Sequence, residues 1–415
     1  MVQPKTYPKT EHGIDIRHID PKALYILEKL RAFDHTAYLV GGSVRDLILG
    51  KKPKDFDIST SAKPEEIKKL FPSSILIGKR FRLAHVRFGQ KIIEVSTFRS
   101  GDIENEELIT EDNIWGSPEE DVLRRDFTIN GLYYDSAKEE VIDYVGGFPD
   151  IEKKMLRAIG QPFLRFKQDP VRMIRCLKFQ ARFGLEVEEE ARLALIDCKS
   201  EITKSAQARV LEEMLRMLES GAAKNFFRLM TDHGLMQHLL PAIAEYLESP
   251  EGNEIYSYLE EADGSLKEPH HSPLDRAVLI ACLVFPLLEH HLKVHFLDRE
   301  KIPHLGEIYK EANSLIDEVF HTYFRLPRRL KIRTLGTLIS QYRITPFQKR
   351  KSKRIRIPRS PEFPLALQFF ELRSRLEPGL QELHDEWKEA YENVAEHLPP
   401  PRRRQRRSRG DRKKS

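Results

Sequence analysis

Hydrophobic positions follow two different periods near the start of the chain. In residues 38–49 a short apolar strand reaches Gly41-Gly42, and apolar positions then recur at helical spacing over residues 43–49. Residues 55–59 alternate between polar and apolar side chains, which is the period of a strand. This pattern predicts a strand–turn–helix–strand unit.

The remaining pattern predicts a few more head elements and then helices. In order, they are a helix over 21–33, a helix over 64–71, a strand over 74–78 and a hairpin over 81–98 that turns near Gly89-Gln90. Residues 1–20 carry little pattern, and the acidic residues 100–111 predict a loop. From residue 169 the spacing is helical, including residues 223–230 and 274–291.

The polar positions of the second strand are two carboxylates. Asp55 and Asp57 fall on one face, while Phe56 and Ile58 point into a core. Two carboxylates side by side offer the oxygen ligands that Mg²⁺ prefers. A solvated strand edge is the alternative interpretation.

The Gly41-Gly42 turn adds a candidate phosphate site. Glycine lets backbone N–H groups approach a phosphate, and the N-terminus of the next helix, with Ser43 and Arg45 nearby, favours negative charge. A phosphate cradle beside metal carboxylates suits the transfer of a nucleotidyl group, for which metals neutralise a triphosphate and activate a hydroxyl. The structural alternative is a simple turn.

Composition bounds the size and the compartment. The 415 residues, 40% hydrophobic and 32% charged, suffice for two or more packed units of a soluble protein. The longest apolar run, residues 277–288, is broken by Pro286 and is shorter than the roughly 20 residues of a membrane span. The N-terminus lacks an apolar signal core. We therefore expect a cytoplasmic protein without a membrane span.

Cysteine and histidine give no sign of a disulfide or a metal site. The three cysteines, Cys176, Cys198 and Cys282, lie far apart within apolar helical patterns, as reduced core residues do. The pairs His270-His271 and His290-His291 lack partners at metal-ligand spacing. We expect all of these residues to be structural.

Charge is distributed unevenly along the chain. Residues 325–359 contain thirteen Lys and Arg and no Asp or Glu, and residues 401–415 contain nine Lys and Arg and one Asp. The net charge of the whole chain is only +5, so the remainder is acidic. Two basic zones against an acidic remainder predict a polyanionic partner such as nucleic acid.

Seven motifs in the first half of the chain resemble one known family. They are GGSVRD, DFDIST, IGKRFRLAHVRFG, IIEVSTFR, EEDVLRRDFTIN, VIDYVGG and DPVRMIRCLKFQARFG. Their sequence and order resemble the nucleotidyltransferase superfamily of bacterial poly(A) polymerases and the CCA-adding tRNA nucleotidyltransferases of the same class. The resemblance implies an α+β head of DNA-polymerase-β type with a mixed sheet, followed by an all-helical neck and body and a disordered basic tail.

The resemblance assigns roles to residues in these motifs. Asp55 and Asp57 would hold two Mg²⁺ ions, and Glu94, in the second arm of the hairpin, is a possible third carboxylate. The predicted catalytic residues are Asp55, Asp57 and Asp126. The predicted nucleotide-binding residues are Gly41, Gly42 and Arg45 for the triphosphate, Arg125, Asp126 and Asn130 for the sugar and active centre, and Asp169 and Arg172 for the base.

Asp126 and Gln168 leave alternatives open. Asp126 could contact the ribose, complete the carboxylate cluster or serve only as a salt-bridged Asp. At position 168 the family has Glu, which helps to hold the base-reading arginine, whereas this chain has Gln. A neutral Gln would hold Arg172 less firmly, which weakens the case for strict ATP selectivity. Arg209 and Glu213 resemble a helix that braces the base-reading helix, and an ordinary surface ion pair is the alternative.

Substrate preference within the family depends on residues 78–86. Bacterial poly(A) polymerases carry a basic pattern here, where the CCA-adding relatives typically have Gly-Thr. Residues Lys79, Arg80, Phe81, His85 and Val86 match the poly(A) pattern. This match favours ATP as the substrate.

The basic stretch late in the chain is a candidate RNA-binding region. Its predicted phosphate-binding residues are Arg328, Arg329, Lys331, Arg350, Lys351, Lys353 and Arg354. The aromatic residues Tyr323, Phe324, Tyr342 and Phe347 could stack on bases, as aromatic side chains do in single-strand binding. The final Arg/Lys-rich residues would add salt-sensitive RNA affinity or recruit a partner such as an RNA-decay protein.

The sequence thus predicts template-independent polyadenylation of RNA 3′ ends, with ATP as substrate and two Mg²⁺ ions as cofactor. The predicted division is an extension over 1–20, a head over 21–150 with a hinge at 143–147, a neck over 151–220, a body over 221–398 and a tail over 399–415. A CCA-adding enzyme is the first alternative. A non-catalytic RNA-binding protein on the same scaffold is the second.

Overall fold

The computed structural model describes residues 3–78, 83–100, 108, 114–268, 272–347 and 355–395. Contacts between Cα atoms divide the chain into two units. The first unit comprises Met1–Pro273 and Asp317–Leu326, and the second comprises Leu274–Ile316 and Pro327–Ser415.

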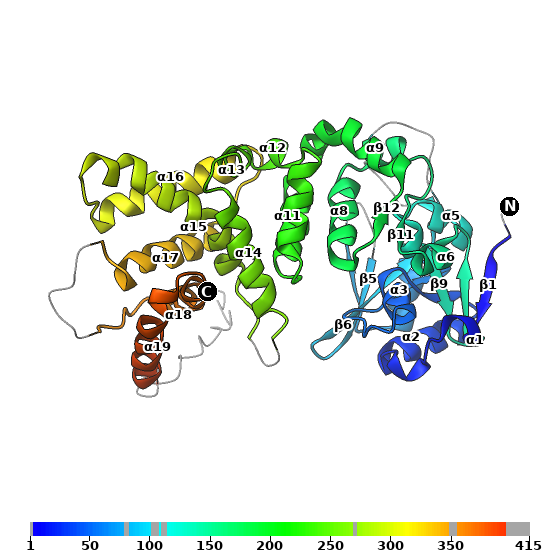
Figure 1. The fold of residues 1–415 in the computed structure, drawn as a ribbon. Coiled ribbons are helices and arrows are strands. Elements are labelled where there is room, and N and C mark those ends of the chain that lie inside the picture. The colour runs from blue at the N-terminus through cyan, green and yellow to red at the C-terminus, as the bar shows by residue number, and fades with distance from the viewer. Residues whose placement is uncertain are drawn as a thin grey trace, which may run out of the picture. The chain divides into compact units, whose positions relative to one another are not determined.

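A mixed sheet of eight strands organises the first unit (Figure 1). Its strands are β1 (Lys5–Pro8), β2 (Ala37–Val40), β3 (Asp57–Thr60), β4 (Ile75–Ile77), β5 (Leu83–Phe88), β6 (Lys91–Thr97), β9 (Leu132–Asp135) and β10 (Glu140–Asp143). The strand order is β1-β10-β9-β2-β3-β6-β5-β4, and every neighbouring pair is antiparallel except β3 with β6. The prediction of an α+β head with a mixed sheet is confirmed.

Five of the eight strands, β2 to β6, follow from the hydrophobic pattern, whereas β9 and β10 were not predicted. The β5–β6 hairpin turns at Gly89-Gln90 as predicted. Strand β1 was not foreseen, because only one of its four side chains, Tyr7, points into the core. That side chain is 3% exposed, and its ring stacks on Phe148 at 4.1 Å between centroids.

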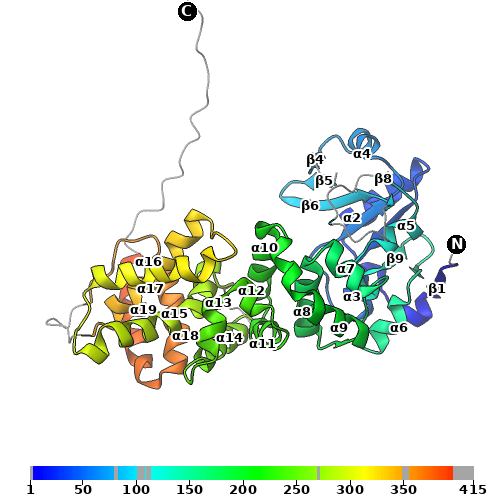
Figure 2. The same ribbon diagram turned by 90° about the horizontal axis from the view of Figure 1, so that it is seen from above.

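Helices cover the sheet and continue the first unit. They are α1 (Lys9–His12), α2 (Pro21–Ala32), α3 (Gly42–Ile48), α4 (Pro64–Leu70), α5 (Pro118–Leu123), α6 (Gly147–Glu152), α7 (Pro162–Gln168), α8 (Val171–Phe183), α9 (Glu189–Cys198), α10 (Gln207–Leu218), α11 (Ala223–Asp232), α12 (Met236–Leu239), α13 (Pro241–Leu247) and α14 (Asn253–Ser265). Two small sheets pair β7 (Arg99–Ser100) with β8 (Ile114–Trp115) and β11 (Met155–Leu156) with β12 (Glu186–Val187). Helices α8 and α11 lie side by side in Figures 1 and 2.

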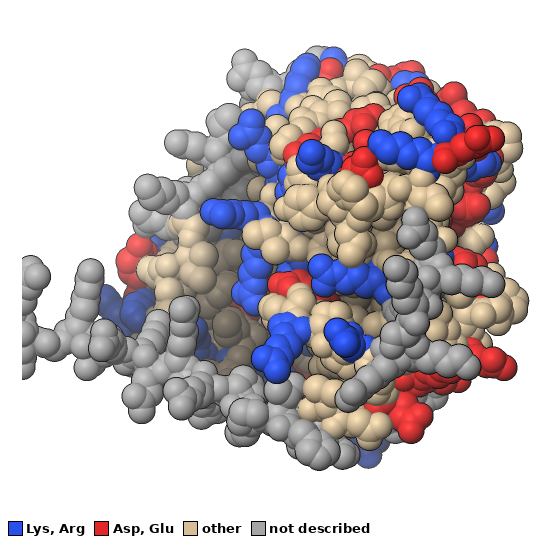
Figure 3. Space-filling view, turned by 90° about the vertical axis from the view of Figure 1, so that its left-hand side faces the viewer, with Lys and Arg blue, Asp and Glu red and all other residues tan. Residues whose placement is uncertain are grey.

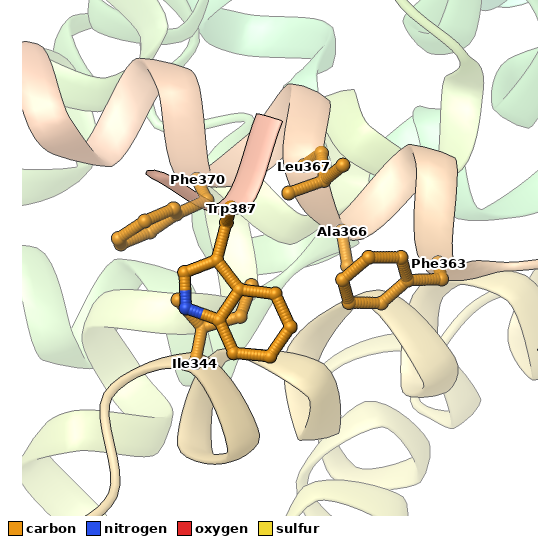
Figure 4. Packing of buried hydrophobic residues seen from close by; sticks show 6 residues of the cluster. All are labelled: Ile344, Phe363, Ala366, Leu367, Phe370 and Trp387. Atoms are coloured by element: carbon orange, nitrogen blue, oxygen red, sulfur yellow. The ribbon is translucent and has the colours of Figure 1, made fainter. Parts of the chain in front are cut away.

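The regular elements described in the second unit are all helices. This unit contains α15 (Arg276–His295), the greater part of α16 (Leu305–His321), α17 (Arg328–Ile344), α18 (Phe363–Leu376) and α19 (Gln381–Ala395). Figure 4 shows how α19 is anchored: Trp387 packs on Phe363 and Phe370 of α18 and on Ile344 at the end of α17. The predicted helical continuation is confirmed, except that the predicted neck also contains the two short strands β11 and β12.

Helix α15 agrees with the helical spacing predicted for residues 274–291. It continues through Pro286, which has no N–H to donate to the preceding turn. Packing against α17 and α18 compensates, since nearly every side chain from Ala277 to Leu288 is buried. The segment Arg276–Arg299 is long and apolar enough to cross a membrane, but 72% of its most apolar window is buried in the protein. Such burial is typical of a core helix.

The cysteines match expectation. Cys176, Cys198 and Cys282 are all buried and free of disulfides.

Candidate active site

Asp57 stands where three strands of the sheet meet. It is the first residue of β3, opposite Val40 of β2 on one side and Glu94 of β6 on the other. The predicted alternation is confirmed, because Asp55 and Asp57 are exposed while Phe56 and Ile58 are buried. The strand itself begins two residues later than predicted, so Asp55 lies in the preceding loop.

The surroundings of Asp57 make its negative charge unfavourable. Burial raises the pKa of the Asp57 carboxyl to about 6, and the negative charges of Glu94 and Asp55 act in the same direction against the lowering effect of Arg125. The residue as a whole is nonetheless exposed, so neighbouring side chains crowd its carboxyl without enclosing it in the core. A group with these neighbours is stabilised in its charged form by a bound cation.

Asp57 lines the pocket described below, whereas Asp55 and Glu94 are not among its lining residues. Parallel pairing of β3 with β6 puts Glu94 directly beside Asp57, and the Nε2 atom of His85 lies 3.3 Å from an oxygen of Glu94. Several carboxylate oxygens at one strand edge form the hard oxygen ligand set of Mg²⁺. The metal-ligand roles of Asp55, Asp57 and Glu94 stay predictions.

Gly41 turns the chain from β2 into α3. Its φ of 67° and ψ of −131° lie in a region open to glycine, and a Cβ there would stand 3.3 Å from the Nη1 atom of Arg125. The Ser43 hydroxyl donates to the Val40 carbonyl at 3.0 Å, so it stabilises the turn. The backbone at Gly41 and Gly42 is therefore open to close approach by a ligand.

Arg45 and Asn130 form the buried floor of the site. The Nη1 atom of Arg45 donates to Oδ1 of Asn130 at 2.5 Å, and its Nη2 atom donates to Asp46 at 2.7 Å. The guanidinium lies 4.5 Å from the ring centroid of Phe183. Since both residues are less than 7% exposed, their positions are fixed before a ligand arrives.

Asp126 is tied to the neck helix α8. Its Oδ2 atom accepts from Nε and Nη2 of Arg175 at 2.7 and 2.6 Å, and Oδ1 accepts from Asn130 and from the Phe127 N–H. Burial alone would raise the pKa of Asp126, but Arg175 and these hydrogen bonds hold it well below its usual range. The salt-bridged alternative therefore describes its observed contacts, and its catalytic role stays a prediction.

One pocket of about 430 Å³ brings the predicted nucleotide-binding residues together. Its lining residues are Gly41, Gly42, Arg45, Asp57, Arg125, Asp126, Asn130, Asp169, Arg172, Arg175, Phe179 and Arg209. All eight predicted nucleotide-binding residues are among them. Five arginines face three aspartates, which leaves an excess of positive charge for a triphosphate.

The two predicted base-reading residues, Asp169 and Arg172, have different kinds of hydrogen-bond partner. Arg209 of α10 donates to both oxygens of Asp169 at 3.1 and 2.9 Å. Arg172 donates through Nη2 to the Arg124 carbonyl at 2.7 Å, while its buried Nη1 atom has no hydrogen-bond partner among the described residues. Arg172 lines the pocket, while this nitrogen itself is buried behind its surface.

Gln168 supports this wall through Arg165. Its Oε1 atom accepts from Nη1 of Arg165 at 2.8 Å, and Nη2 of Arg165 donates to the carbonyls of Leu123 and Arg125. These carbonyls flank the Arg124 carbonyl that Arg172 uses. Gln168 thus contributes to the position of Arg172 through the backbone between α5 and β9.

Helix α10 braces α8, as the resemblance implied. Glu213 accepts from Arg175 at 3.4 Å and also pairs with Lys178, both on α8. Arg209 pairs with Asp169 just before α8. The alternative of a surface pair between Arg209 and Glu213 is wrong, because each of them bonds across to the neighbouring helix region.

Arg175, Phe179 and Arg209 are the pocket residues that sequence reasoning did not assign to the site. Arg175 and Phe179 follow Arg172 at helical spacing, so a single face of α8 carries all three. Because Arg175 shares a helix face with Arg172, its spacing could have predicted that it lines the same pocket. For Arg209 the sequence gave only the bracing pattern, since its partner lies 40 residues away.

The turn predicted as a hinge is well bonded. The carboxylate of Asp143 accepts from four successive backbone N–H groups, those of Val145, Gly146, Gly147 and Phe148, at 2.9 to 3.1 Å. A Cβ on Gly147 would lie 2.1 Å from the Thr128 carbonyl oxygen. The hinge role stays a prediction.

The candidate RNA-binding region is partly described. Arg328 and Arg329 are exposed in the first turn of α17, and Lys331 is half-buried. Together with Ile332, Arg333, Pro361 and Glu362, the two arginines line a hollow of about 560 Å³. On the face drawn in Figure 3, Lys and Arg side chains gather about a hollowed area. Arg350, Lys351, Lys353 and Arg354 lie outside the described residues.

The expectation of base-stacking aromatics is wrong for three of four residues. Tyr323, Phe324 and Tyr342 are each less than 8% exposed. The Tyr323 hydroxyl donates to the carbonyls of Ile202 and Ser205, so it serves the core of the first unit. Phe347, 36% exposed, is the remaining candidate. The other three rings are buried in the hydrophobic core, and the composition of the segment alone does not predict that burial.

Three further predictions fall outside the described residues. They concern Lys79, Arg80 and Phe81 of the poly(A)-type motif, most of the loop 100–111 and the tail 399–415. His85 and Val86 of that motif lie on β5.

Comparison with known families and proteins gives a consistent result. The family described as "Poly A polymerase head domain" matches residues 37–157, and that described as "Probable RNA and SrmB- binding site of polymerase A" matches residues 184–247. Poly(A) polymerase I of Escherichia coli is 35% identical over 97% of this chain and 91% of its own length. A CCA-adding enzyme of Bacillus velezensis is 35% identical over 54% of this chain and 57% of its own length.

Solved structures support the fold. A tRNA nucleotidyltransferase complexed with a primer tRNA and an incoming ATP analog aligns with a TM-score of 0.58 at 19% identity, over 89% of this chain and 99% of that one. The head-domain match and the 35% identity to the Escherichia coli enzyme over 97% of this chain show the family. The chain belongs to the nucleotidyltransferase family of bacterial poly(A) polymerases and CCA-adding enzymes.

Proposed function

We propose that this protein adds AMP from ATP to RNA 3′ ends without a template and releases pyrophosphate. The observation that carries the proposal is the single pocket in which predicted triphosphate, sugar and base contacts surround Asp57. The near-complete coverage of the Escherichia coli poly(A) polymerase favours polyadenylation within the family. We place the reaction in the cytoplasm.

Asp55 and Asp57 would hold two Mg²⁺ ions, with Glu94 as a possible third carboxylate ligand. When bound, the ions would lower the pKa of the RNA 3′-hydroxyl and neutralise charge on the pyrophosphate. The raised pKa of Asp57 supports this assignment, because crowded carboxylates gain most from a cation. Both carboxylates must be deprotonated to bind the metal.

The remaining pocket residues would position the nucleotide. The Gly41-Gly42 backbone would face the phosphates, and Arg125, fixed by Asp121 at 2.9 Å, would lie beside them. Asn130 is held by Arg45 and Asp126, and would present its ordered amide to the sugar. Because these contacts already exist, little rearrangement is needed to orient the α-phosphate for attack.

Base selection would rest on Arg172 and Asp169. The Nη1 atom of Arg172 has no partner among the described residues, so an acceptor on the adenine edge could satisfy it. Asp169 accepts from Arg209 and retains lone pairs for the adenine amino group. The protein would thus read the base in place of a template strand.

RNA would be held by the basic surface of α17 and by the residues that follow it. Arg328 and Arg329 are exposed and form no ion pair with the described residues. Residues 399–415 would add salt-sensitive affinity or attract an RNA-decay protein. We retain the proposed boundaries of head, neck and body at residues 150 and 220.

Pyrophosphate release tests the reaction type. With ATP, Mg²⁺ and an RNA that ends in a free 3′-hydroxyl, we expect pyrophosphate in a fixed ratio to AMP incorporated. An RNA with a 3′-deoxy end should yield none. Pyrophosphate with the blocked RNA, or no Mg²⁺-dependent ATP binding by calorimetry, would reject the proposal in favour of simple hydrolysis or a non-catalytic RNA binder.

CCA addition is the second candidate function. It is favoured by the match to the Bacillus velezensis CCA-adding enzyme over 54% of the chain. It requires the same carboxylates and the same pocket, so the two candidates differ in nucleotide and RNA substrate alone.

A further inference from the structure

The second unit contains a cluster of metal-binding side chains that the proposed reaction does not use. His291 and His295 lie in the last turns of α15, and Glu311 lies on α16. The ligand atoms of these three residues all lie within 4.8 Å of one another. We propose that they bind one transition-metal ion, with Zn²⁺ as the preferred ion.

The geometry of α15 explains how two imidazoles meet. Residues four apart lie on the same face of a helix, and the rings of His291 and His295 are 5.3 Å apart between centroids. The Nδ1 atom of His295 lies 3.3 Å from Oε2 of Glu311. Sequence analysis considered the adjacent pair His290-His291 and missed the relevant spacing of 291 and 295, because the third ligand comes from another helix.

The donor set selects the class of metal. Two imidazole nitrogens and one carboxylate oxygen suit Zn²⁺ and its neighbours Co²⁺, Ni²⁺ and Cu²⁺, whereas Mg²⁺ prefers oxygen alone. Three protein ligands leave one position of a tetrahedral ion for water. Ligand atoms on such an ion are roughly 3.3 Å apart, given bonds of about 2.0–2.1 Å. His295 and Glu311 already have this spacing, and the widest separation in the cluster, at most 4.8 Å, exceeds it by no more than about 1.5 Å.

The side chains have room to move by that amount. The side chain of His295 is 45% exposed and that of Glu311 is 28% exposed, so their rotamers can change without disturbing the core. His291 is half-buried and is the most restrained of the three. A bound ion would tie the C-terminal end of α15 to α16 and stabilise that pair of helices.

The plain alternative is one surface hydrogen bond between a histidine and a carboxylate. The same chain provides an example of that alternative on α16, where Nε2 of His321 lies 3.3 Å from Asp317. This pair has the same separation and comparable exposure but is not part of a three-ligand cluster among the described residues. His321→Ala is therefore a matched control.

The test uses the untagged full-length protein, stripped of metal and then supplied with excess Mg²⁺. Zn²⁺ is titrated by calorimetry, and Co²⁺ is titrated as a spectroscopic probe of coordination number. We expect one Zn²⁺ per chain, and visible Co²⁺ absorption of the intensity typical of four or five ligands. His295→Ala and Glu311→Gln should each weaken Zn²⁺ binding by more than the roughly 10- to 100-fold cost of losing an outer-shell partner.

Controls separate this site from other sources of binding. His321→Ala should bind Zn²⁺ as wild type does, and so should Asp57→Ala, in which the predicted Mg²⁺ site is removed. Circular dichroism should show the same helix content in every variant. The proposal is overturned if wild type binds no stoichiometric Zn²⁺, if His295→Ala binds unchanged, or if Asp57→Ala abolishes the binding.

Discussion

The pocket around Asp57 and the basic surface of α17 both contain several arginines, but the arginines of the two regions differ in how they are held. In the pocket, Arg45, Arg125 and Arg175 each bond to a named carboxylate and hold one geometry. On α17, Arg328 and Arg329 are exposed and have no ion-pair partner among the described residues. Fixed arginines can read one small ligand, whereas unpaired arginines can follow a polymer of any sequence.

The difference separates chemistry from RNA affinity. Changes in the pocket should act on rate and base choice, and changes on α17 should act on RNA binding and its salt dependence. The following predictions test that separation.

The largest effect is expected for Asp57→Ala. Removal of this carboxylate should lower AMP transfer by on the order of 10³-fold or more, the scale of losing a charge-stabilising group in phosphoryl transfer. RNA affinity and the melting temperature should stay close to wild type, because Asp57 is an exposed residue. Single-turnover extension and RNA binding measure the two effects. Retained transfer would reject the metal assignment.

Arg172→Ala should come next. Its buried Nη1 atom is the donor proposed to read adenine, so kcat/KM for ATP should fall by roughly 10- to 100-fold, the cost of one or two hydrogen bonds to a charged group. The ratio of ATP to CTP incorporation should fall as well. Initial rates with each nucleotide give that ratio. An equal loss with both nucleotides would assign Arg172 to structure and not to base reading.

Arg175→Ala should reduce stability. It leaves the buried Asp126 without its ion-pair partner, and we expect a loss of about 2 kcal/mol in urea unfolding, less than the 3–5 kcal/mol of fully buried pairs because Arg175 is a third exposed. The pKa of Asp126 is held low, so this stabilisation is complete above the unfolded-state pKa of about 3.9 and fades as the pH falls below it.

Arg192→Ala is the matched control for that prediction. Its pair with Glu189 is just as short, at 2.6 Å, but lies on the surface. We expect no measurable change in its unfolding. If the two variants were equally stable, the clamp between Asp126 and α8 would have no energetic role.

Arg328→Ala combined with Arg329→Ala should weaken RNA binding by about tenfold and leave kcat at saturating RNA unchanged. Loss of two phosphate contacts lowers the slope of log affinity against log salt by roughly 1.4 for a single strand. Lys301→Ala, which removes a cation already paired with Glu307 at 3.0 Å, is the control. A changed kcat would break the proposed separation between pocket and surface.

Gln168→Glu should give the smallest effect. A carboxylate would bind Arg165 more tightly than the amide does. It would thereby restrict the movement of the Arg124 carbonyl, which accepts a hydrogen bond from Arg172. If ATP binding gains about 0.5–1 kcal/mol relative to CTP binding, the ratio of ATP to CTP incorporation should rise by roughly 2- to 5-fold. Competition between the two nucleotides in one reaction measures it. A fall in the ratio would show that Gln168 is the better support in this chain.

Local pattern predicted the elements that carry the site. The Gly41-Gly42 turn, the exposed Asp57 beside the buried Ile58, and Glu94 on the hairpin arm all followed from period and turn chemistry. The parallel pairing that sets Glu94 beside Asp57 depends on contacts 37 residues apart, which hydrophobic period alone does not encode.

Contacts between distant segments explain what the sequence missed. The bond of Arg209 to Asp169 spans 40 residues, and the meeting of His295 with Glu311 depends on two separate helices. Tyr323 and Tyr342 were predicted to stack on bases because they lie in or beside a basic stretch, but tertiary packing buries both. Strand β1 was too short for its pattern to show.

The most direct test of the account is one extension assay with purified protein and Mg²⁺. ATP, CTP or both are offered to an unstructured RNA and, separately, to a tRNA that lacks its terminal CCA. The account predicts long adenylate tails on the unstructured RNA from ATP alone. Addition confined to the tRNA, dependent on CTP and ending at CCA, would contradict it.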